Sequence, residues 1–163
     1  MKLYHGSYMA IEKPDLKFAR RETDFGKGFY LTPIKAQVRN WAIRFIKDYG
    51  AAVVSSYDYA QDSIAKLFPE LKVLEFEGHT KEWLDFVTSC RLGLPVDTKW
   101  DLVTGGVADD KVFDTLQLYF DAYIGKREAI NRLRYKKPNF QYCFKNQALI
   151  DTCLKFTGAE VLK

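Results

Sequence analysis

Apolar residues recur along this chain with two different periods, which separates the expected helices from the expected strands. Between positions 34 and 49 they return at every third or fourth position, at Ile34, Val38, Trp41, Ala42, Phe45 and Ile46. This spacing predicts one amphipathic helix that ends at Gly50. Thr32 and Pro33 stand just before it and are typical of an N-cap and a first helical residue.

The same patterns predict the remaining elements. Further helices are expected over 60–68, 80–91, 111–124, 126–135 and 147–156, with Thr80, one of Asp109 and Asp110, and Asn146 as caps of the second, third and last. Strands are expected over 2–5, 29–31, 51–59, 73–76, 100–104, 140–144 and 158–162. The strands and helices alternate without the regular order of a doubly wound sheet. We therefore predict an α+β fold with split antiparallel or mixed sheets and surrounding helices.

Composition narrows the class of protein. The chain has 163 residues, of which 47% are hydrophobic, and it shows no linker or repeat, so one domain over 1–163 is expected and disorder is excluded. The net charge of +4 permits an anionic ligand but does not imply nucleic acid. Three cysteines without a CxxC pair favour a reducing, cytoplasmic compartment and buried thiols. No apolar run predicts a signal peptide or a membrane span.

Two early segments carry residues suited to ligand binding. The first is Tyr4-His5-Gly6-Ser7, and the second is DFGKGFYLT over 24–32. Glycine lets the backbone approach a ligand closely, and imidazole can donate or accept a hydrogen bond. Each segment alone is more simply a structural histidine or a plain turn. The second lacks the third glycine of the dinucleotide fingerprint and runs into a strand, so a Rossmann fold is not indicated.

Together the two segments resemble the ADP-ribosyltransferases of the diphtheria toxin and poly(ADP-ribose) polymerase type, called H-Y-E after three site residues. More narrowly, the chain resembles a family of small bacterial proteins catalogued as a domain of unknown function within that superfamily. The resemblance also includes PDL, NWA, DLVTGGVADD, FQYCF and LKF, and it spans Leu3 to Phe156. It implies an ADP-ribosyltransferase-like fold that binds NAD⁺ as a cosubstrate in a cleft between two small sheets, with no metal.

The resemblance assigns roles to matching residues. His5 would hydrogen-bond the adenosine-side ribose of NAD⁺, and Gly6 would hold the nicotinamide carboxamide through its backbone. Ser7 would lie beside that contact. Tyr30 would stack on the nicotinamide ring.

Further cofactor contacts are expected near these residues. By the same resemblance, Phe29 and Thr32 would shape the strand, and Gln37 would lie near the nicotinamide. Arg20 and Arg21 could meet the pyrophosphate, because a guanidinium pairs well with phosphate oxygens. A solvated surface position explains these two arginines equally well.

The third member of the H-Y-E set departs from the pattern. Gln141 stands where glutamate is expected, so the charge that stabilises the positive sugar in the transition state is missing. Gln141 can still accept a hydrogen bond from a ribose hydroxyl, and Gln141→Glu is expected to raise NAD⁺ hydrolysis. Asp109 and Asp110 are candidate replacement acids, although a helix cap and a first-turn residue are the simpler interpretation.

The function predicted from this resemblance is that of a mono-ADP-ribosyltransferase that modifies a macromolecule, either protein or nucleic acid. The resemblance also suggests that the protein could be a toxin held by a small antitoxin protein. The segment before the FQYCF strand is where relatives recognise the acceptor, and here it is basic: Lys126, Arg127, Arg132, Arg134, Lys136 and Lys137. The alternatives are a degenerate module that binds NAD⁺ or ADP-ribose and a nucleic-acid binding protein. His79 is expected to be exposed, and the three tryptophans are expected in the core.

Overall fold

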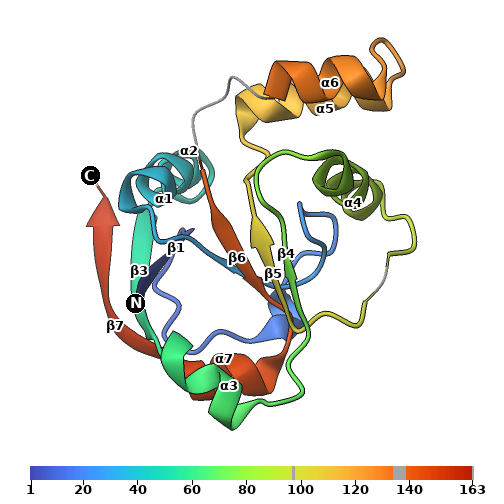
Figure 1. Ribbon diagram of the computed structural model, residues 1–163. Coiled ribbons are helices and arrows are strands. Elements are labelled where there is room, and N and C mark those ends of the chain that lie inside the picture. The colour runs from blue at the N-terminus through green and yellow to red at the C-terminus, as the bar shows by residue number, and fades with distance from the viewer. Residues whose placement is uncertain (97, 134–138, 163) are drawn as a thin grey trace.

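The computed structural model describes residues 1–96, 98–133 and 139–162, which form two sheets with helices around them (Figure 1). The three-stranded sheet has the order β1 (Lys2–Ser7), β3 (Ala52–Tyr59), β7 (Leu154–Leu162), with antiparallel neighbours. The four-stranded sheet has the order β2 (Phe29–Leu31), β6 (Gln141–Phe144), β5 (Leu102–Gly105), β4 (Val73–Glu75). In it β4 and β5 run parallel and the other pairs antiparallel. The α+β prediction with split sheets is confirmed.

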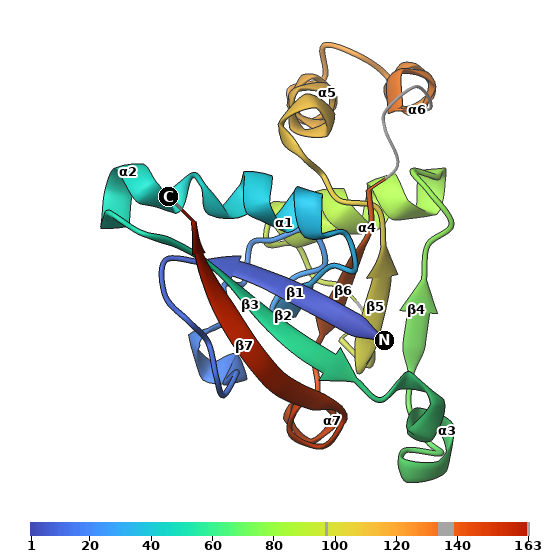
Figure 2. The ribbon, with the colours of Figure 1, turned by 90° about the vertical axis from the view of Figure 1, so that its left-hand side faces the viewer.

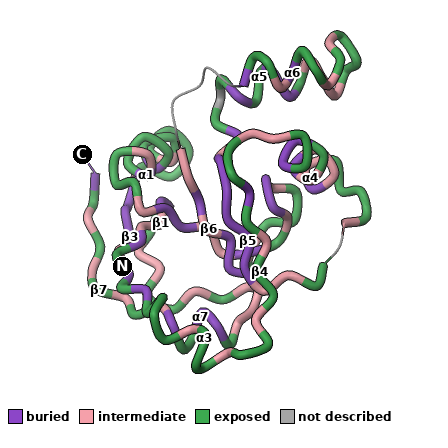
Figure 3. The backbone as a smooth tube through the Cα atoms, viewed as in Figure 1, coloured by how far each residue is buried: buried purple, intermediate pink, exposed green. Residues whose placement is uncertain are grey.

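The two sheets meet where β1 passes β2. Tyr4 and Thr32 exchange two backbone hydrogen bonds, of 2.9 and 3.0 Å. Next to this junction an apolar cluster packs between the sheets, and its members include Leu3, Leu31, Tyr57 and Phe144. Burial is concentrated in β3, β5 and β6 (Figure 3). The junction therefore joins the early HGS segment to the FYLT strand by backbone contacts.

Helices cover the sheets and one end of them. They are α1 (Lys35–Ala42), α2 (Phe45–Tyr49), α3 (Ile64–Leu67), α4 (Lys81–Arg91), α5 (Asp110–Phe120), α6 (Lys126–Leu133) and α7 (Gln147–Cys153), with short 3₁₀ turns at Leu16–Phe18 and Gln61–Ser63. Helix α1 packs on the three-stranded sheet, where Val38 and Ala42 join Val54 in a small apolar cluster. Helices α5 and α6 form a hairpin that stands beyond the ends of β5 and β6 (Figure 2).

Three predicted caps are confirmed by hydrogen bonds to the first turn. Thr80 accepts from the Trp83 amide, Asp109 from the Val112 amide and Asn146 from the Leu149 amide. Each side chain satisfies an amide that has no partner within its own helix.

The predicted single helix over 34–49 is wrong. The structure has two helices there, broken at Ile43 and Arg44, and the first begins only at Lys35. Thr32 is not its N-cap, because α1 begins at Lys35 and Ile34 holds the N-cap position; the Thr32 hydroxyl accepts from the Ile34 amide, before the first helical residue.

Two other boundaries and one core assignment also differ. The expected helix over 60–68 is a 3₁₀ turn followed by α3, and the last helix ends at Cys153, so that β7 begins at Leu154. Trp83 is fully buried, but 44% of Trp41 is exposed, against the expectation of a core position. All three cysteines are free and buried, as expected.

Candidate functional site

His5, Tyr30 and Gln141 are far apart in sequence but lie on three adjacent strands. His5 is on β1, which bridges to β2 through Tyr4 and Thr32. Tyr30 is on β2, where it lies opposite Cys143 of β6. Gln141 is the first residue of β6. The structure thus places His5, Tyr30 and Gln141 on strands that meet at the junction of the sheets.

The side chains of these strands point to two faces. Successive residues of a strand point to opposite sides, so Tyr30, its partner Cys143 and Gln141 share one face, and Phe29 lies on the other. The His5 ring lies on the Phe29 side, with 4.5 Å between ring centroids. His5 therefore reaches Tyr30 through the backbone and not through the aromatic ring.

His5 is held as a neutral imidazole. Its Nδ1 atom lies 2.8 Å from the Tyr30 carbonyl oxygen, which can only accept, so Nδ1 carries the proton. Burial lowers the pKa of His5, an effect that the hydrogen bond to Tyr30 only partly offsets. The Nε2 atom is left as an acceptor.

The Tyr30 hydroxyl anchors the loop that precedes β2. It accepts from the Phe25 amide at 2.9 Å, donates to the Gly26 carbonyl at 2.7 Å and lies 2.9 Å from the Thr23 hydroxyl. Gly26 has a φ of 73°, a left-handed conformation that suits glycine. The pKa of Tyr30 is raised, mainly because the hydroxyl is buried. The hydroxyl thus holds the loop in place, and only the ring of Tyr30 is left to serve a ligand.

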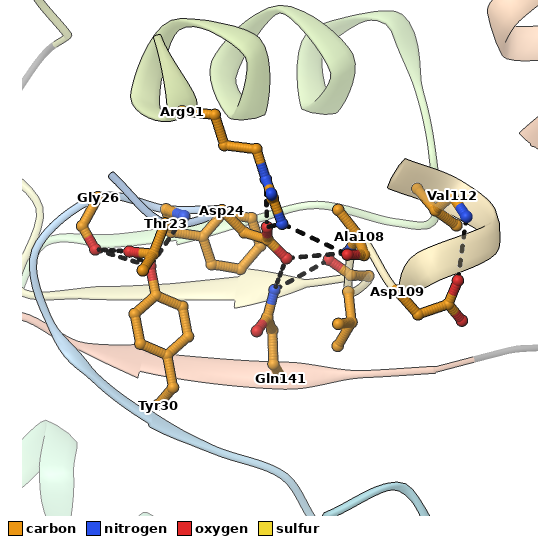
Figure 4. Close-up of polar contacts among 12 residues, drawn as sticks. Thr23, Asp24, Gly26, Tyr30, Arg91, Ala108, Asp109, Val112 and Gln141 are labelled. Carbon is orange, nitrogen blue, oxygen red and sulfur yellow. Dashed lines mark hydrogen bonds and ion pairs between the residues drawn. The ribbon is translucent and has the colours of Figure 1, made fainter. Parts of the chain in front are cut away.

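Gln141 is buried, and its amide faces a carboxylate. The Nε2 atom donates to Asp24 Oδ2 at 2.8 Å and to the Gly106 carbonyl at 3.3 Å (Figure 4). Gln141 is 7% exposed and Asp24 is 5% exposed. A carboxylate therefore lies beside the position where the resemblance expects one, but it belongs to a different residue.

Asp24 is fixed by further donors. Its Oδ1 accepts from Arg91 Nε at 2.8 Å and also from Arg91 Nη2, while Oδ2 accepts from the Ala108 amide at 2.8 Å. A carboxylate this deeply buried needs such compensation. Neither Asp24 nor Arg91 is among the site residues predicted from the sequence. The one available signal was an acidic residue at the start of the glycine-rich DFGKG run.

Asp109 behaves as the simpler interpretation expects. It is exposed, its Oδ1 caps α5 at the Val112 amide, and its Oδ2 accepts from Asn139. Asn139 in turn exchanges two hydrogen bonds with the Val107 backbone. Asp110 begins α5, and its side chain lies outside the described part of the chain. The described contacts of Asp109 are therefore those of a cap.

Contacts within the fold account for the presence of glutamine at position 37 and glycine at position 6. Both ends of the Gln37 amide bond the backbone of Phe140, at 3.1 and 3.2 Å, which ties α1 to the start of β6. A Cβ atom on Gly6 would lie 3.1 Å from Val38 and Ala42, so glycine lets α1 approach β1 closely. Ser7 and Thr32 are buried near the same junction. Their expected contacts with NAD⁺ stay predictions.

The expected cationic contacts are exposed or already paired. Arg20 and Arg21 lie exposed before the loop. On α6, Lys126 pairs with Asp85 at 2.7 Å and Arg132 with Glu128 at 2.8 Å. Of the other basic candidates, Arg127 is exposed, and Arg134, Lys136 and Lys137 lie outside the described residues.

The expectation that His79 is exposed is wrong. The residue is half-buried against Trp83, with 4.4 Å between ring centroids, and burial lowers its pKa. Its Nε2 atom is buried and has no hydrogen-bond partner among the described residues. A Cβ atom on Gly106 would lie 2.6 Å from that nitrogen, so the second glycine of the GG pair makes room for the imidazole.

Two surface hollows lie away from these residues. One of about 410 Å³ is lined by Phe76, Phe86 and Trp100 among others, and one of about 250 Å³ lies between Phe68 and Asn146. Neither lining includes His5, Tyr30 or Gln141. Among the described residues no cluster of three or more His, Cys, Asp or Glu is arranged to hold a metal ion. No helix in the described ranges has the length and hydropathy needed to cross a membrane.

Comparison with known proteins gives one family. No curated protein and no solved structure matches the chain. A family model does match, over residues 1–156, and its description is "Protein of unknown function (DUF3990)". The match covers both sheets except residues 157–162 of β7, and it includes His5, Tyr30 and Gln141. The chain therefore belongs to the DUF3990 family.

Proposed function

We propose that this chain is a mono-ADP-ribosyltransferase that uses NAD⁺ and belongs to the H-Y-E superfamily. The observation that carries the proposal is the arrangement of His5, Tyr30 and Gln141 on the adjacent strands β1, β2 and β6. These positions were selected from sequence motifs alone, and they are separated by 25 and 111 residues along the chain. Their strands meet at one junction, which supports a shared role, and a ligand that used all three would have to reach the Phe29 side, where the His5 ring lies, as well as the Tyr30 and Gln141 side.

Each residue has chemistry that suits the reaction. His5 keeps Nε2 free as an acceptor for a ribose hydroxyl because Nδ1 is bound to Tyr30. Gln141 offers an amide oxygen to the nicotinamide-side ribose. In the reaction the bond from ribose C1 to nicotinamide breaks, and nicotinamide leaves with the electron pair. A lone pair of the acceptor then bonds to C1, and its proton passes to water.

A second candidate is a module that binds NAD⁺ or ADP-ribose without turnover. It is favoured by the neutral amide of Gln141 and by Arg91, which compensates the charge of Asp24. Without an uncompensated anion, the developing positive charge on the sugar is less stabilised. The two candidates predict the same binding and differ only in nicotinamide release.

Calorimetric titration with NAD⁺, paired with a nicotinamide-release assay, tests the proposal. The parent chain should bind NAD⁺ and release nicotinamide, and His5→Ala should weaken both. Asp101→Asn is the matched control, since Asp101 accepts from Lys72 and Asn146 just before β5, at the end opposite Gly106. Binding without release supports the second candidate. An absence of binding rejects both.

The acceptor, the compartment and any antitoxin partner belong to the same proposal. Incubation of a cytoplasmic extract with labelled NAD⁺ separates protein from nucleic-acid acceptors. If the acceptor is a nucleic acid, replacing Arg132, Arg134, Lys136 and Lys137 together by Gln should reduce labelling and spare NAD⁺ hydrolysis, and salt should have the same effect. Unchanged labelling would favour a protein acceptor.

A further inference from the structure

Asp24 forms a buried pair with Gln141 and has no role of its own in the proposed reaction. Building on the proposed function, we infer that Asp24 is a positioning residue, which orients the Gln141 amide so that its oxygen faces the bound ribose. Asp24 acts through Gln141 and not on the substrate itself.

The partners of Gln141 determine the direction of its amide. Asp24 Oδ2 and the Gly106 carbonyl oxygen are both acceptors, and both lie on the same side of the amide. Only the NH₂ group can satisfy two acceptors, so the opposite amide orientation would set oxygen against oxygen. The Oε1 atom consequently points away from Asp24 (Figure 4) and makes no hydrogen bond with the described residues. It is the atom left to accept from a ligand hydroxyl.

Asp24 is itself rigidly held, as a positioning residue must be. Arg91 occupies Oδ1, and the Ala108 amide occupies Oδ2 together with Gln141. These donors come from α4, from the segment after β5 and from β6, so the carboxylate is fixed against three separate elements. With both oxygens occupied, Asp24 is not available as a base. Its effect on the reaction must pass through the Gln141 amide.

A double-mutant cycle on nicotinamide release measures that dependence. Asp24→Asn keeps the shape of the side chain, but it can present either an amide oxygen or an amide NH₂ group to Gln141, so it no longer fixes the direction of the Gln141 amide. We expect kcat to fall by about tenfold or more, with KM for NAD⁺ changed by less than about twofold. In a Gln141→Ala background, Asp24→Asn should lower kcat by less than about twofold. Asp101→Asn should leave both constants unchanged.

Two results would overturn the inference. One is an equal fall in kcat in both backgrounds, because Asp24 would then act independently of Gln141. The other is an unchanged kcat in a folded Asp24→Asn variant. Thermal melting of each variant shows whether the fold is kept.

A measurement on the unsubstituted chain does not depend on NAD⁺ or on any variant folding. Hydrogen exchange of the Gln141 side-chain NH₂ should be much slower than that of the exposed Gln61. Equal exchange would overturn the orienting contact. A parent chain that neither binds NAD⁺ nor releases nicotinamide, but shows slow exchange at Gln141, would reject the proposed function and the catalytic use of the pair while confirming the contact.

Discussion

The Nδ1 atom of His5 lies 2.8 Å from the backbone oxygen of Tyr30, so one imidazole links β1 to β2 where the two sheets meet. His5→Ala removes this link together with the proposed ribose contact. We expect NAD⁺ affinity to fall by about 1–3 kcal/mol, as for the loss of a buried hydrogen bond. Titration calorimetry measures the affinity. A folded variant that binds NAD⁺ as tightly as the parent would contradict the assignment of the site.

Tyr30→Phe tests the hydroxyl separately from the ring. The variant leaves the Phe25 amide without its partner, while the Gly26 carbonyl keeps the Thr23 hydroxyl as a donor, so the free energy of unfolding should fall by about 1–3 kcal/mol. Urea unfolding checks this, with Tyr123→Phe as the control because Tyr123 is 78% exposed. NAD⁺ affinity should change little if the ring alone contacts nicotinamide. Equal stability in the two variants would show that the loop does not depend on Tyr30.

The two histidines predict a loss of stability in mild acid. Burial lowers the pKa of both His5 and His79 in the folded chain. The unfolded chain therefore binds more protons, so this stability is fully present above about pH 6.5 and is lost as pH falls below it. The melting temperature should drop between about pH 7.5 and 5.5, and the double variant His5→Gln, His79→Gln should drop less. Parallel pH profiles of parent and double variant would contradict this.

Gln141→Glu separates two opposite expectations. From the sequence alone, a restored carboxylate should raise NAD⁺ hydrolysis. In the structure, that carboxylate would face Asp24 Oδ2 and the Gly106 carbonyl, two acceptors with no proton to share. Like charges in a buried site are unfavourable, so we now expect a less stable variant with lower nicotinamide release. Higher release from a variant as stable as the parent would favour the sequence-based expectation.

Local features of the fold were predictable because their causes are local. The caps at Thr80, Asp109 and Asn146 depend only on a short polar side chain and the next turn of backbone. The single helix over 34–49 failed because its apolar period includes Trp41 and Ile46, which the structure leaves exposed. A periodic face predicts a helix surface, but it does not show whether that surface meets a core.

The site was predictable where a motif marked it and not elsewhere. His5, Tyr30 and Gln141 belong to recognisable segments, whereas the partners of Gln141 do not. Asp24 contacts Gln141 across 117 positions and Arg91 across 67. Such contacts arise from strand order and helix packing, which local spacing does not encode. For the same reason the burial of His79 was not predicted, because it depends on the close approach of the imidazole to Gly106.

The order of strands in the three-stranded sheet also governs when the site can form. The central strand β3 has β1 on one side and β7 on the other, and β7 extends to Leu162. During synthesis β1 and β3 are made early, but a two-stranded ladder is marginal by itself. The sheet that carries His5 is completed only when β7 has been made and has paired with β3. Any activity of this junction therefore requires β7, and a fragment that ends before β7 should be inert.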